Sequence, residues 1–306
     1  METYKENTKW RDKHFDPESD YMVKLSHVYR KSNLKKDYDF LLTKEAELIK
    51  KICEGTTAHH FVFAVYYYLL WNGFFSINRR FEFDRSKYSI LEHSGLGVTT
   101  GKGVCLNIAA HFRDIIKHLT NDYYVFAVAV HLKESDYFNA SNPEIHRNIA
   151  DNKSISNSQS SSAHKKPSFN HANVLIGDKI TGHDYIFDPT NFIMYNVVDT
   201  YENNQPLYRI DATISLDLDI SVDQKGYKKV LDTIAKYNKH LARKKYIRYS
   251  DEALDKVLKT GILLCQKHIK DILEFRKKYD YLYDRIAQNM PDFDEMKNTV
   301  QKLIIK

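Results

Sequence analysis

One cysteine, Cys105, stands where a glycine-rich stretch meets a pattern of helical spacing. In GKGVCLNIAAHFRDII (101–116) two glycines flank a lysine, and the apolar residues after the cysteine recur every three to four positions. At a helix N-terminus the peptide dipoles and unpaired N–H groups favour the thiolate, the form of cysteine that attacks electrophiles. The glycines let the backbone pass close to a substrate. Cys105 is therefore a candidate nucleophile, and a small buried residue that opens a helix is the alternative.

A thiol nucleophile needs a base, and the base needs a partner that fixes its tautomer. The segment NHANVLIGDKITGHDYIFDP (170–189) holds two strand patterns around a turn predicted at 177–182. The pair His171 and Asp188 is centred on that turn. An antiparallel hairpin of this register places the two residues directly opposite each other, with Cβ atoms about 5 Å apart. The sequence therefore predicts a His171–Asp188 pair.

The other histidines and aspartates nearby have simpler explanations. His183 falls at the edge of the turn, and its partner in the same register is an isoleucine. His111 and His118 lie one turn and more along the predicted helix, beyond hydrogen-bond reach of a thiol at its start, so we expect structural or exposed roles. Asp178 and Asp184 are expected to cap the turn.

Metal and disulfide chemistry are not indicated by the sequence. No HExxH or CxxC spacing occurs, so we expect no metal site and no cofactor. Three widely separated cysteines do not form a disulfide framework. Cys53 and Cys265 lie in apolar patterns and are predicted to be buried core residues.

The elements that must position these residues alternate between helix and strand. A helix is predicted from Cys105 to about Leu119, followed by a buried strand at Tyr123–Leu132. The two strands of the hairpin follow, and then further strands at about Met194–Asp199 and Pro206–Ile220. Between them, residues 134–168 are polar and serine-rich, which predicts a long flexible insertion.

Helices are predicted on both sides of this core. The N-terminal part contains a short helix after Thr43 and a buried helix over Phe61–Trp71, whose eleven residues are too few for a membrane span of ~20. Helix is also predicted after Lys225, and Ser250 is the predicted N-cap of the helix that follows it. One long apolar stripe follows at helical spacing: Leu254, Leu258, Ile262, Cys265, Ile269, Leu273, Tyr279, Tyr283 and Ile286.

Charged side chains are distributed unevenly along the chain. Residues 225–306 carry 20 basic and 11 acidic side chains, a net charge of +9, whereas the remaining residues have a net charge of −3. We therefore predict three regions: an N-terminal helical segment (1–80), a catalytic core with the insertion (81–222) and a basic helical C-terminal region (223–306).

Three blocks in this order resemble the transglutaminase-like superfamily of papain-related cysteine enzymes: YSILEHSGLGVTTGKGVCLNIAAHFRDII (88–116), NHANVLI (170–176) and YIFDPTNF (185–192). The resemblance covers a third of the chain. It implies an α+β fold with a papain/transglutaminase-like core, in which the cysteine at a helix N-terminus packs on an antiparallel sheet, with helical N- and C-terminal additions. It also implies a triad of Cys105 as nucleophile, His171 as base and Asp188 as orienting carboxylate.

The chain departs from the family pattern in places. Asn173 stands where the family often has a tryptophan. The backbone N–H of Cys105 is the expected first oxyanion donor, and the second is expected in the loop 92–104. Nothing resembles the calcium-binding loops of the animal enzymes, so no metal dependence is expected.

The resemblance implies acyl transfer through a thioester on Cys105. We predict hydrolysis of amide bonds in a peptide or protein, by a cysteine peptidase or amidase. The alternative is a transglutaminase, which passes the acyl group from a protein glutamine to an amine. The insertion could act as a flap over the cleft or be an inert loop.

A binding protein is the second alternative. The basic run KHLARKKYIR (239–248) would suit nucleic acid, although such runs are more often simply solvated, so nucleic acid is not our first choice of partner. An inactive scaffold of the same fold belongs to this alternative too. With neither a signal peptide nor a membrane span, and no paired cysteines, we predict a cytoplasmic protein without a membrane partner, and export by a route that reads other signals is the alternative.

Overall fold

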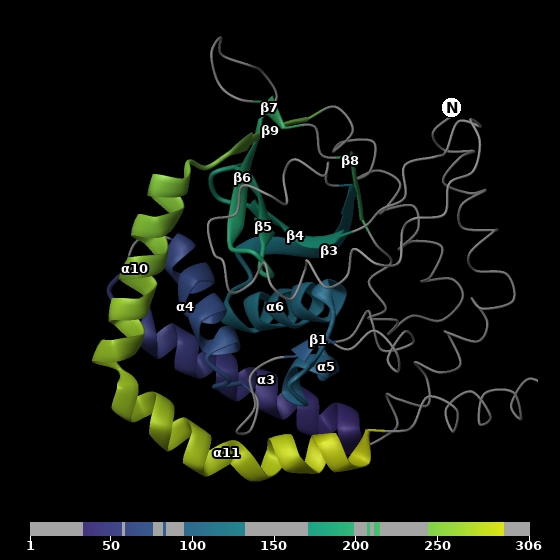
Figure 1. Ribbon diagram of the computed structural model, residues 1–306, viewed down its shortest axis with the longest axis vertical. Coiled ribbons are helices and arrows are strands. Elements are labelled where there is room, and N and C mark those ends of the chain that lie inside the picture. The colour runs from purple at the N-terminus through teal and green to yellow at the C-terminus, as the bar shows by residue number, and fades with distance from the viewer. Residues whose placement is uncertain are drawn as a thin grey trace, which may run out of the picture.

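A computed structural model of the chain combines helices with an antiparallel sheet (Figure 1). The structure describes residues 33–56, 59–75, 82–83, 95–131, 171–198, 207–208, 211–214 and 244–290. The α+β class predicted from the sequence is confirmed in these residues. The predicted insertion at 134–168, the first 32 residues and the segment 225–243 lie outside them.

Within the described ranges, seven strands form one sheet in the order β7-β9-β6-β5-β4-β3-β8, and each neighbouring pair is antiparallel. The strands are β3 (Tyr123–His131), β4 (His171–Asp178), β5 (Asp184–Asp188), β6 (Ile193–Val198), β7 (Leu207–Tyr208), β8 (Asp211–Ile214) and β9 (Lys245–Arg248). The strand that begins at His171 therefore lies inside the sheet, between β3 and β5.

The register of the β4–β5 hairpin differs from the predicted one. The ladder pairs Val174 with Phe187, so the hairpin closes over 179–183 instead of 177–182. His171 and Asp188 are consequently not directly opposite each other, and that prediction is wrong by two positions. Because side chains alternate between faces with a period of two, a shift of two leaves both residues on the same face. They become diagonal neighbours.

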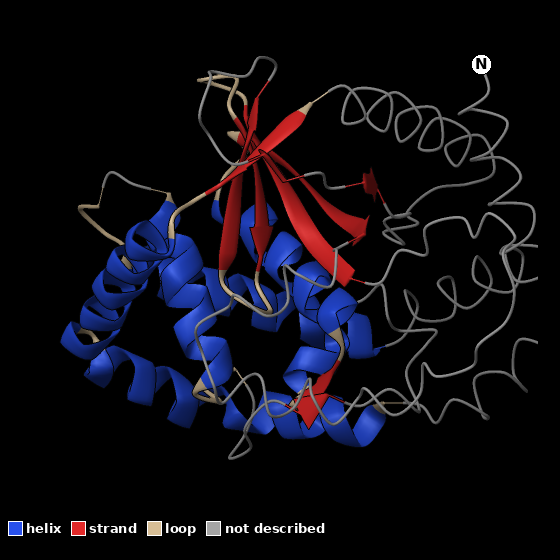
Figure 2. Ribbon diagram, turned by 45° about the horizontal axis from the view of Figure 1, so that its top comes forward, coloured by secondary structure: helices blue, strands red, loops and turns tan. Residues whose placement is uncertain are grey.

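Helices lie on one side of the sheet (Figure 2). Helix α6 (Cys105–Leu119) packs on β3 and β4, and α3 (Asn33–Ile52) packs on α6. Helix α4 (His60–Trp71) joins the same core, where Phe63 stacks on Phe187 with ring centroids 5.0 Å apart. The predicted stripe of α6 is buried at Ile108, Phe112, Ile115 and Ile116, which fixes the helix against the sheet.

The N-terminal helices agree with the sequence in type and differ in length. Helix α3 begins at Asn33, ten residues before the predicted start at Thr43, because Leu34, Tyr38, Leu41 and Leu42 extend its buried face. Helix α4 is a buried core helix, as predicted. In the described part of the chain, no helix has both the length and the apolar character needed to cross a membrane.

The C-terminal region differs more from the prediction. Residues 245–248 form strand β9, which pairs with β6, so this region is not helical throughout. Ser250 caps α10 (Asp251–Lys267), as its Oγ accepts the N–H of Ala253 at 3.2 Å. The long helical pattern breaks at His268, and α11 (Ile269–Asn289) continues in another direction (Figure 1). The break exposes two members of the predicted stripe, Ile269 (40%) and Leu273 (54%).

Candidate active site

Cys105 is the first residue of α6, as predicted, and its side chain is partly buried. The chain reaches it through α5 (Leu96–Thr99) and β2 (Lys102–Gly103), which pairs with β1 (Glu82–Phe83). The N-cap is Val104, in extended conformation. The backbone N–H groups of the first helical turn have no partner within the helix, so they surround the thiol with positive potential.

Asn107, two residues after the cysteine, holds this approach in place. Its Oδ1 accepts the N–H of Val104 at 3.0 Å, and its side chain is almost completely buried. A Cβ at Gly103 would lie 2.9 Å from the Cβ of Asn107, and a Cβ at Gly97 would lie 2.5 Å from the carbonyl oxygen of Lys102. These two glycines are therefore needed for close packing. The sequence analysis did not identify Asn107, because the usual capping signal is Ser or Thr at the N-cap with Glu or Gln at the third helical position, and this helix has Val104 and Asn107 there.

His171 and Asp188 form a buried hydrogen-bonded pair. The Nε2 of His171 lies 2.8 Å from Oδ2 of Asp188, and the two residues are 9% and 1% exposed. The predicted pairing therefore occurs although the register that predicted it is wrong. The diagonal geometry is sufficient because an imidazole and a carboxylate both extend well beyond their Cβ atoms.

Three further donors fix the Asp188 carboxylate. Oδ1 accepts the backbone N–H of Thr190 at 2.9 Å and that of Asn191 at 3.1 Å, and Oδ2 also accepts the side-chain amide of Asn191 at 3.0 Å. With His171 this gives four donors, which is the full capacity of a carboxylate. Asn191 was missed in the sequence, where Asp-Pro-Thr-Asn already signals a turn closed by the aspartate side chain.

Cys105 lies close enough to the same imidazole to affect its charge, since it is among the groups that raise the pKa of His171. Because Asp188 occupies Nε2, Nδ1 is the ring nitrogen left for the exchange of a proton with the sulfur. The structure thus brings together all three residues that the sequence singled out, from the start of one helix and from two adjacent strands.

Electrostatics favour a charged imidazole in this arrangement. Burial opposes the charge on His171, but the Asp188 carboxylate and the Cys105 thiol outweigh it and hold the pKa of His171 well above 6.5. Burial likewise opposes the charge on Asp188, but His171 and the donors from Asn191 and Thr190 keep the pKa of Asp188 below its ordinary value. An imidazolium in this position can donate a proton to a leaving group.

The other two cysteines lie in the core, as predicted. Cys53 and Cys265 are 8% and 0% exposed. Burial raises the pKa of each thiol to about 12. At neutral pH both stay protonated and unreactive, which makes them internal controls for Cys105.

Asn173 lies beside the triad with an unpaired amide. It shares a face of β4 with His171, and the ladder continued by one residue puts it across from Asp188. The side chain is completely buried, and neither Oδ1 nor Nδ2 has a hydrogen-bond partner. The hydroxyl of Thr190 is also buried and unpaired. Each buried polar group without a partner lowers the free energy of unfolding by about 1–3 kcal/mol. These polar atoms therefore do not help to stabilise the fold.

His111 belongs to a separate buried cluster on the same helix. Its Nε2 lies 2.8 Å from Oε2 of Glu45, its Nδ1 lies 3.1 Å from the hydroxyl of Tyr66, and Tyr283 donates to the other oxygen of Glu45 at 2.6 Å. All four side chains are almost completely buried. The cluster ties α6 to α3, α4 and α11, which is the structural role expected for His111.

The other histidines and aspartates considered in the sequence analysis lie away from the Cys105 thiol. His183 sits in the hairpin turn, where its backbone carbonyl accepts the N–H of Asp178. The Asp178 carboxylate caps that turn by accepting the N–H groups of Ile180 and Thr181 at 2.8 and 3.1 Å, as predicted. Asp184, also predicted to cap it, is instead the first residue of β5 and accepts the Tyr124 hydroxyl. His118 is exposed near the end of α6.

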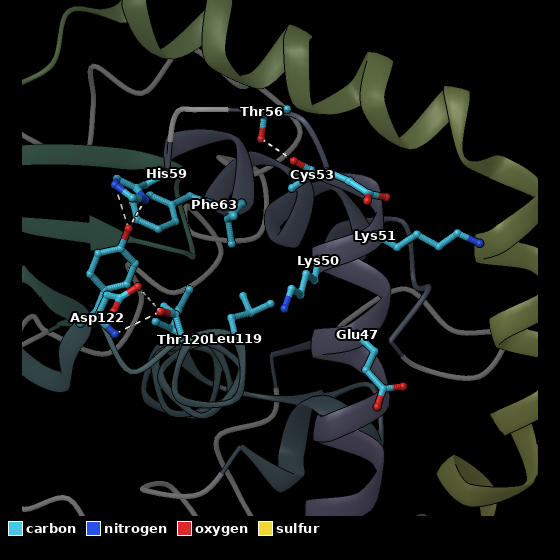
Figure 3. A pocket seen from close by; sticks show the side chains of 14 residues that line it. Glu47, Lys50, Lys51, Cys53, Thr56, His59, Phe63, Leu119, Thr120 and Asp122 are labelled. Atoms are coloured by element: carbon cyan, nitrogen blue, oxygen red, sulfur yellow. Dashed lines mark hydrogen bonds between the residues drawn. The ribbon is translucent and has the colours of Figure 1, made fainter.

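A cavity of about 670 Å³ lies at the far end of α6 from Cys105 (Figure 3). Its apolar wall includes Phe63 and Leu119, and its rim includes Lys50 and Glu54. Lys51, also on the rim, reaches away to Asp271. Since α6 has fifteen residues, the cavity is about 20 Å from the thiol. It is therefore not the substrate pocket of the triad.

In the described ranges, no group of three or more histidine, cysteine, aspartate or glutamate side chains is arranged to hold a metal ion. Comparisons with protein-family models, with curated proteins and with solved structures give no match to the chain.

Proposed function

We propose that this chain is a cysteine enzyme that cleaves amide bonds of peptide or protein substrates through a thioester intermediate. The observation that carries the proposal is the position of one imidazole: His171 is hydrogen-bonded to the Asp188 carboxylate and lies close enough to the Cys105 thiol for the two groups to interact electrostatically. The cysteine-bearing helix on an antiparallel sheet suits the transglutaminase-like core that the sequence resembles. We propose that fold family on the same grounds.

In the proposed reaction the Cys105 thiolate attacks the carbonyl carbon of the amide. The N–H groups at the start of α6 stabilise the oxyanion that forms. His171 gives the proton on Nδ1 to the departing nitrogen, the C–N bond breaks and a thioester remains. Water then attacks the thioester, His171 takes its proton, and the acid and the free thiolate are released.

Asp188 holds the imidazole in one orientation throughout. The four donors hold the carboxylate in place, so the Nε2–H of His171 stays directed at Oδ2. The carboxylate also stabilises the imidazolium before the amine departs.

The alternative outcome is transfer to an amine in place of water. The triad performs the same first step in both reactions, and surfaces that bind the acceptor decide between them. Hydrolysis remains our first proposal.

Alkylation tests the proposal without knowledge of the substrate. The protein is treated with iodoacetamide at pH 6, and the labelling of each cysteine is followed by peptide mass spectrometry. We expect Cys105 to be labelled at least tenfold faster than Cys53 or Cys265, because those two thiols are buried and protonated. His171→Gln should remove most of the difference.

His118→Gln is the matched control. His118 is exposed on α6, the helix that begins with Cys105, so its substitution should leave the labelling rate of Cys105 unchanged. If Cys105 reacts no faster than the buried cysteines, or if His171→Gln leaves its rate intact, the proposed mechanism is wrong. Incubation of a peptide library with and without a labelled primary amine, using wild type and Cys105→Ala, then separates hydrolysis from transfer.

A further inference from the structure

The bend between α10 and α11 carries an exposed surface of unusual composition. Between residues 259 and 281, eleven side chains are exposed. We call these the elbow surface: Lys259, Leu263, Gln266, Lys267, Ile269, Lys270, Leu273, Glu274, Lys277, Lys278 and Tyr281. Five are lysines, four are apolar or aromatic and one is acidic, so the surface combines a net charge of +4 with apolar side chains.

The apolar members are strongly exposed. Leu263 is 64% exposed, Leu273 is 54% exposed and Tyr281 is 56% exposed. Ile269 and Leu273 are one turn apart on α11, and Leu273 and Tyr281 are two turns apart, so all three follow one side of the helix. The opposite side of α11 is buried in the core through Ile272 and other residues. The helix therefore has a second apolar stripe that its own fold leaves uncovered.

The lysines around this stripe are available for a partner. Lys267, Lys270 and Lys277 form no ion pair with any described residue. Lys259 pairs only with Asp255 on the exposed side of its own helix, a contact of little energetic weight. The charge of the surface is thus not neutralised by the described chain, and it calls for an anionic partner.

The elbow lies at the outer edge of the molecule, where α10 and α11 meet at an angle (Figure 1). A convex corner with protruding aliphatic side chains and lysines suits the boundary between lipid headgroups and acyl chains. Aliphatic side chains add nothing to phosphate recognition in a nucleic acid, where stacking aromatics are the usual complement. Charge complementarity and shape together therefore favour a lipid surface.

We propose that the elbow surface binds anionic membranes, with Leu263, Ile269 and Leu273 inserted at the interface and the lysines on the headgroups. The sequence prediction of no membrane partner rested on the lack of a spanning segment, and a surface that lies on a membrane needs none. The proposal is independent of the triad.

Vesicle co-sedimentation of the full chain tests the proposal. The vesicles contain either phosphatidylcholine alone or equal parts of phosphatidylcholine and phosphatidylserine. We expect sedimentation only with the anionic vesicles, and weaker binding in higher salt. Leu263→Ser with Leu273→Ser should lower the affinity about tenfold or more. Lys267→Gln, Lys270→Gln and Lys277→Gln should lower it about fivefold for each lysine.

Two control variants keep these results specific to the elbow. Ile180→Ser removes an apolar side chain that is 78% exposed at the hairpin turn. The triple variant of Lys36→Gln, Lys50→Gln and Lys179→Gln removes the same charge from exposed positions elsewhere. Both should bind like wild type, and circular dichroism checks that every variant is folded.

Absence of binding to the anionic vesicles overturns the proposal, and so does equal loss of binding in the control variants. Equal binding to neutral and anionic vesicles contradicts the role of the lysines. Binding of a DNA duplex through the same lysines, with no vesicle binding, would assign the surface to nucleic acid. None of these results depends on whether Cys105 is reactive, so this proposal and the proposed function can fail separately.

Discussion

Asp188 lies diagonal to His171 across the β4–β5 hairpin, two positions from the directly opposed site, and its Oδ2 still meets Nε2 of the histidine at 2.8 Å. The side-chain reach of the two residues makes the contact tolerant of this shift. A shift by one position would not be tolerated, because it would move one of them to the other face of the sheet.

The charge of Asp188 should be needed for the reactivity of Cys105. Asp188→Asn keeps the size of the side chain but weakens a hydrogen bond to a charged group, which is worth about 1.5–3 kcal/mol. We expect the rate of Cys105 alkylation at pH 6 to fall by about ten- to a hundredfold. Asp178→Asn is the control, because Asp178 caps the hairpin turn instead of contacting the triad. An unchanged rate in Asp188→Asn would remove the carboxylate from the mechanism.

The buried pair should make stability depend on pH in a defined window. His171 has a raised pKa, so its contribution is complete below its unfolded pKa of about 6.5 and is lost as the pH rises through the folded value. Asp188 has a lowered pKa, so its contribution is complete above about 3.9 and is lost as the pH falls through its folded value. The free energy that the pair adds should therefore be largest between about pH 4 and 6.5.

Urea unfolding of wild type and of the double variant His171→Gln with Asp188→Asn, measured across the pH range, checks this window. The difference in unfolding free energy between the two proteins should reach a plateau inside it and shrink on both sides. A difference that does not vary with pH would show that the pair is not ionised in the folded protein.

Asn173 and Asn107 should respond in opposite ways to the same substitution. Leucine has the branching of asparagine without its polar atoms, so Asn173→Leu removes two unpaired buried groups and should be neutral or stabilising by about 1 kcal/mol. Asn107→Leu breaks the bond to the N–H of Val104 and should destabilise by about 1–3 kcal/mol. Thermal unfolding measures both. If Asn173→Leu is the more damaging variant, a bound water satisfies its amide.

The cluster around His111 should be a major source of stability. Glu45→Leu leaves a histidine and a tyrosine buried without their partner, and each buried polar group left unsatisfied costs about 1–3 kcal/mol. Tyr283→Phe should cost about 1–3 kcal/mol, because it leaves Glu45 short of a donor. Tyr281→Phe, on the exposed side of the same helix, should change the unfolding free energy by less than about 0.5 kcal/mol. Equal effects of the two tyrosine substitutions would contradict this account.

Signals from residues close in sequence were enough to predict features that lie within a single helix or strand. The bounds of α6, the buried helix α4 and the Ser250 cap follow from periodicity and capping residues near in sequence. The same is true of the buried Cys53 and Cys265, because an apolar pattern around a cysteine predicts its burial without knowledge of the fold.

Those local signals did not predict contacts between segments that lie far apart in the sequence. Strand β9 is a strand because β6 and β7 offer it backbone partners, in a stretch whose local composition favours helix. The break at His268 turns α11 onto α3, and this exposes Ile269 and Leu273, which a single straight helix would bury. Asn107 became visible only through the bond that it makes to the N–H of Val104 in the cysteine turn.

The sequence by itself singled out Cys105, His171 and Asp188 as candidates, since a cysteine at a helix start and a histidine and an aspartate on one hairpin can be recognised from spacing. Only the tertiary structure decided that His171 is hydrogen-bonded to Asp188 and lies close enough to Cys105 to interact with it. Spacing defines the face on which a side chain lies, whereas the distance between two elements depends on how the sheet and α6 pack. That packing is the sum of many contacts from residues far apart in the chain.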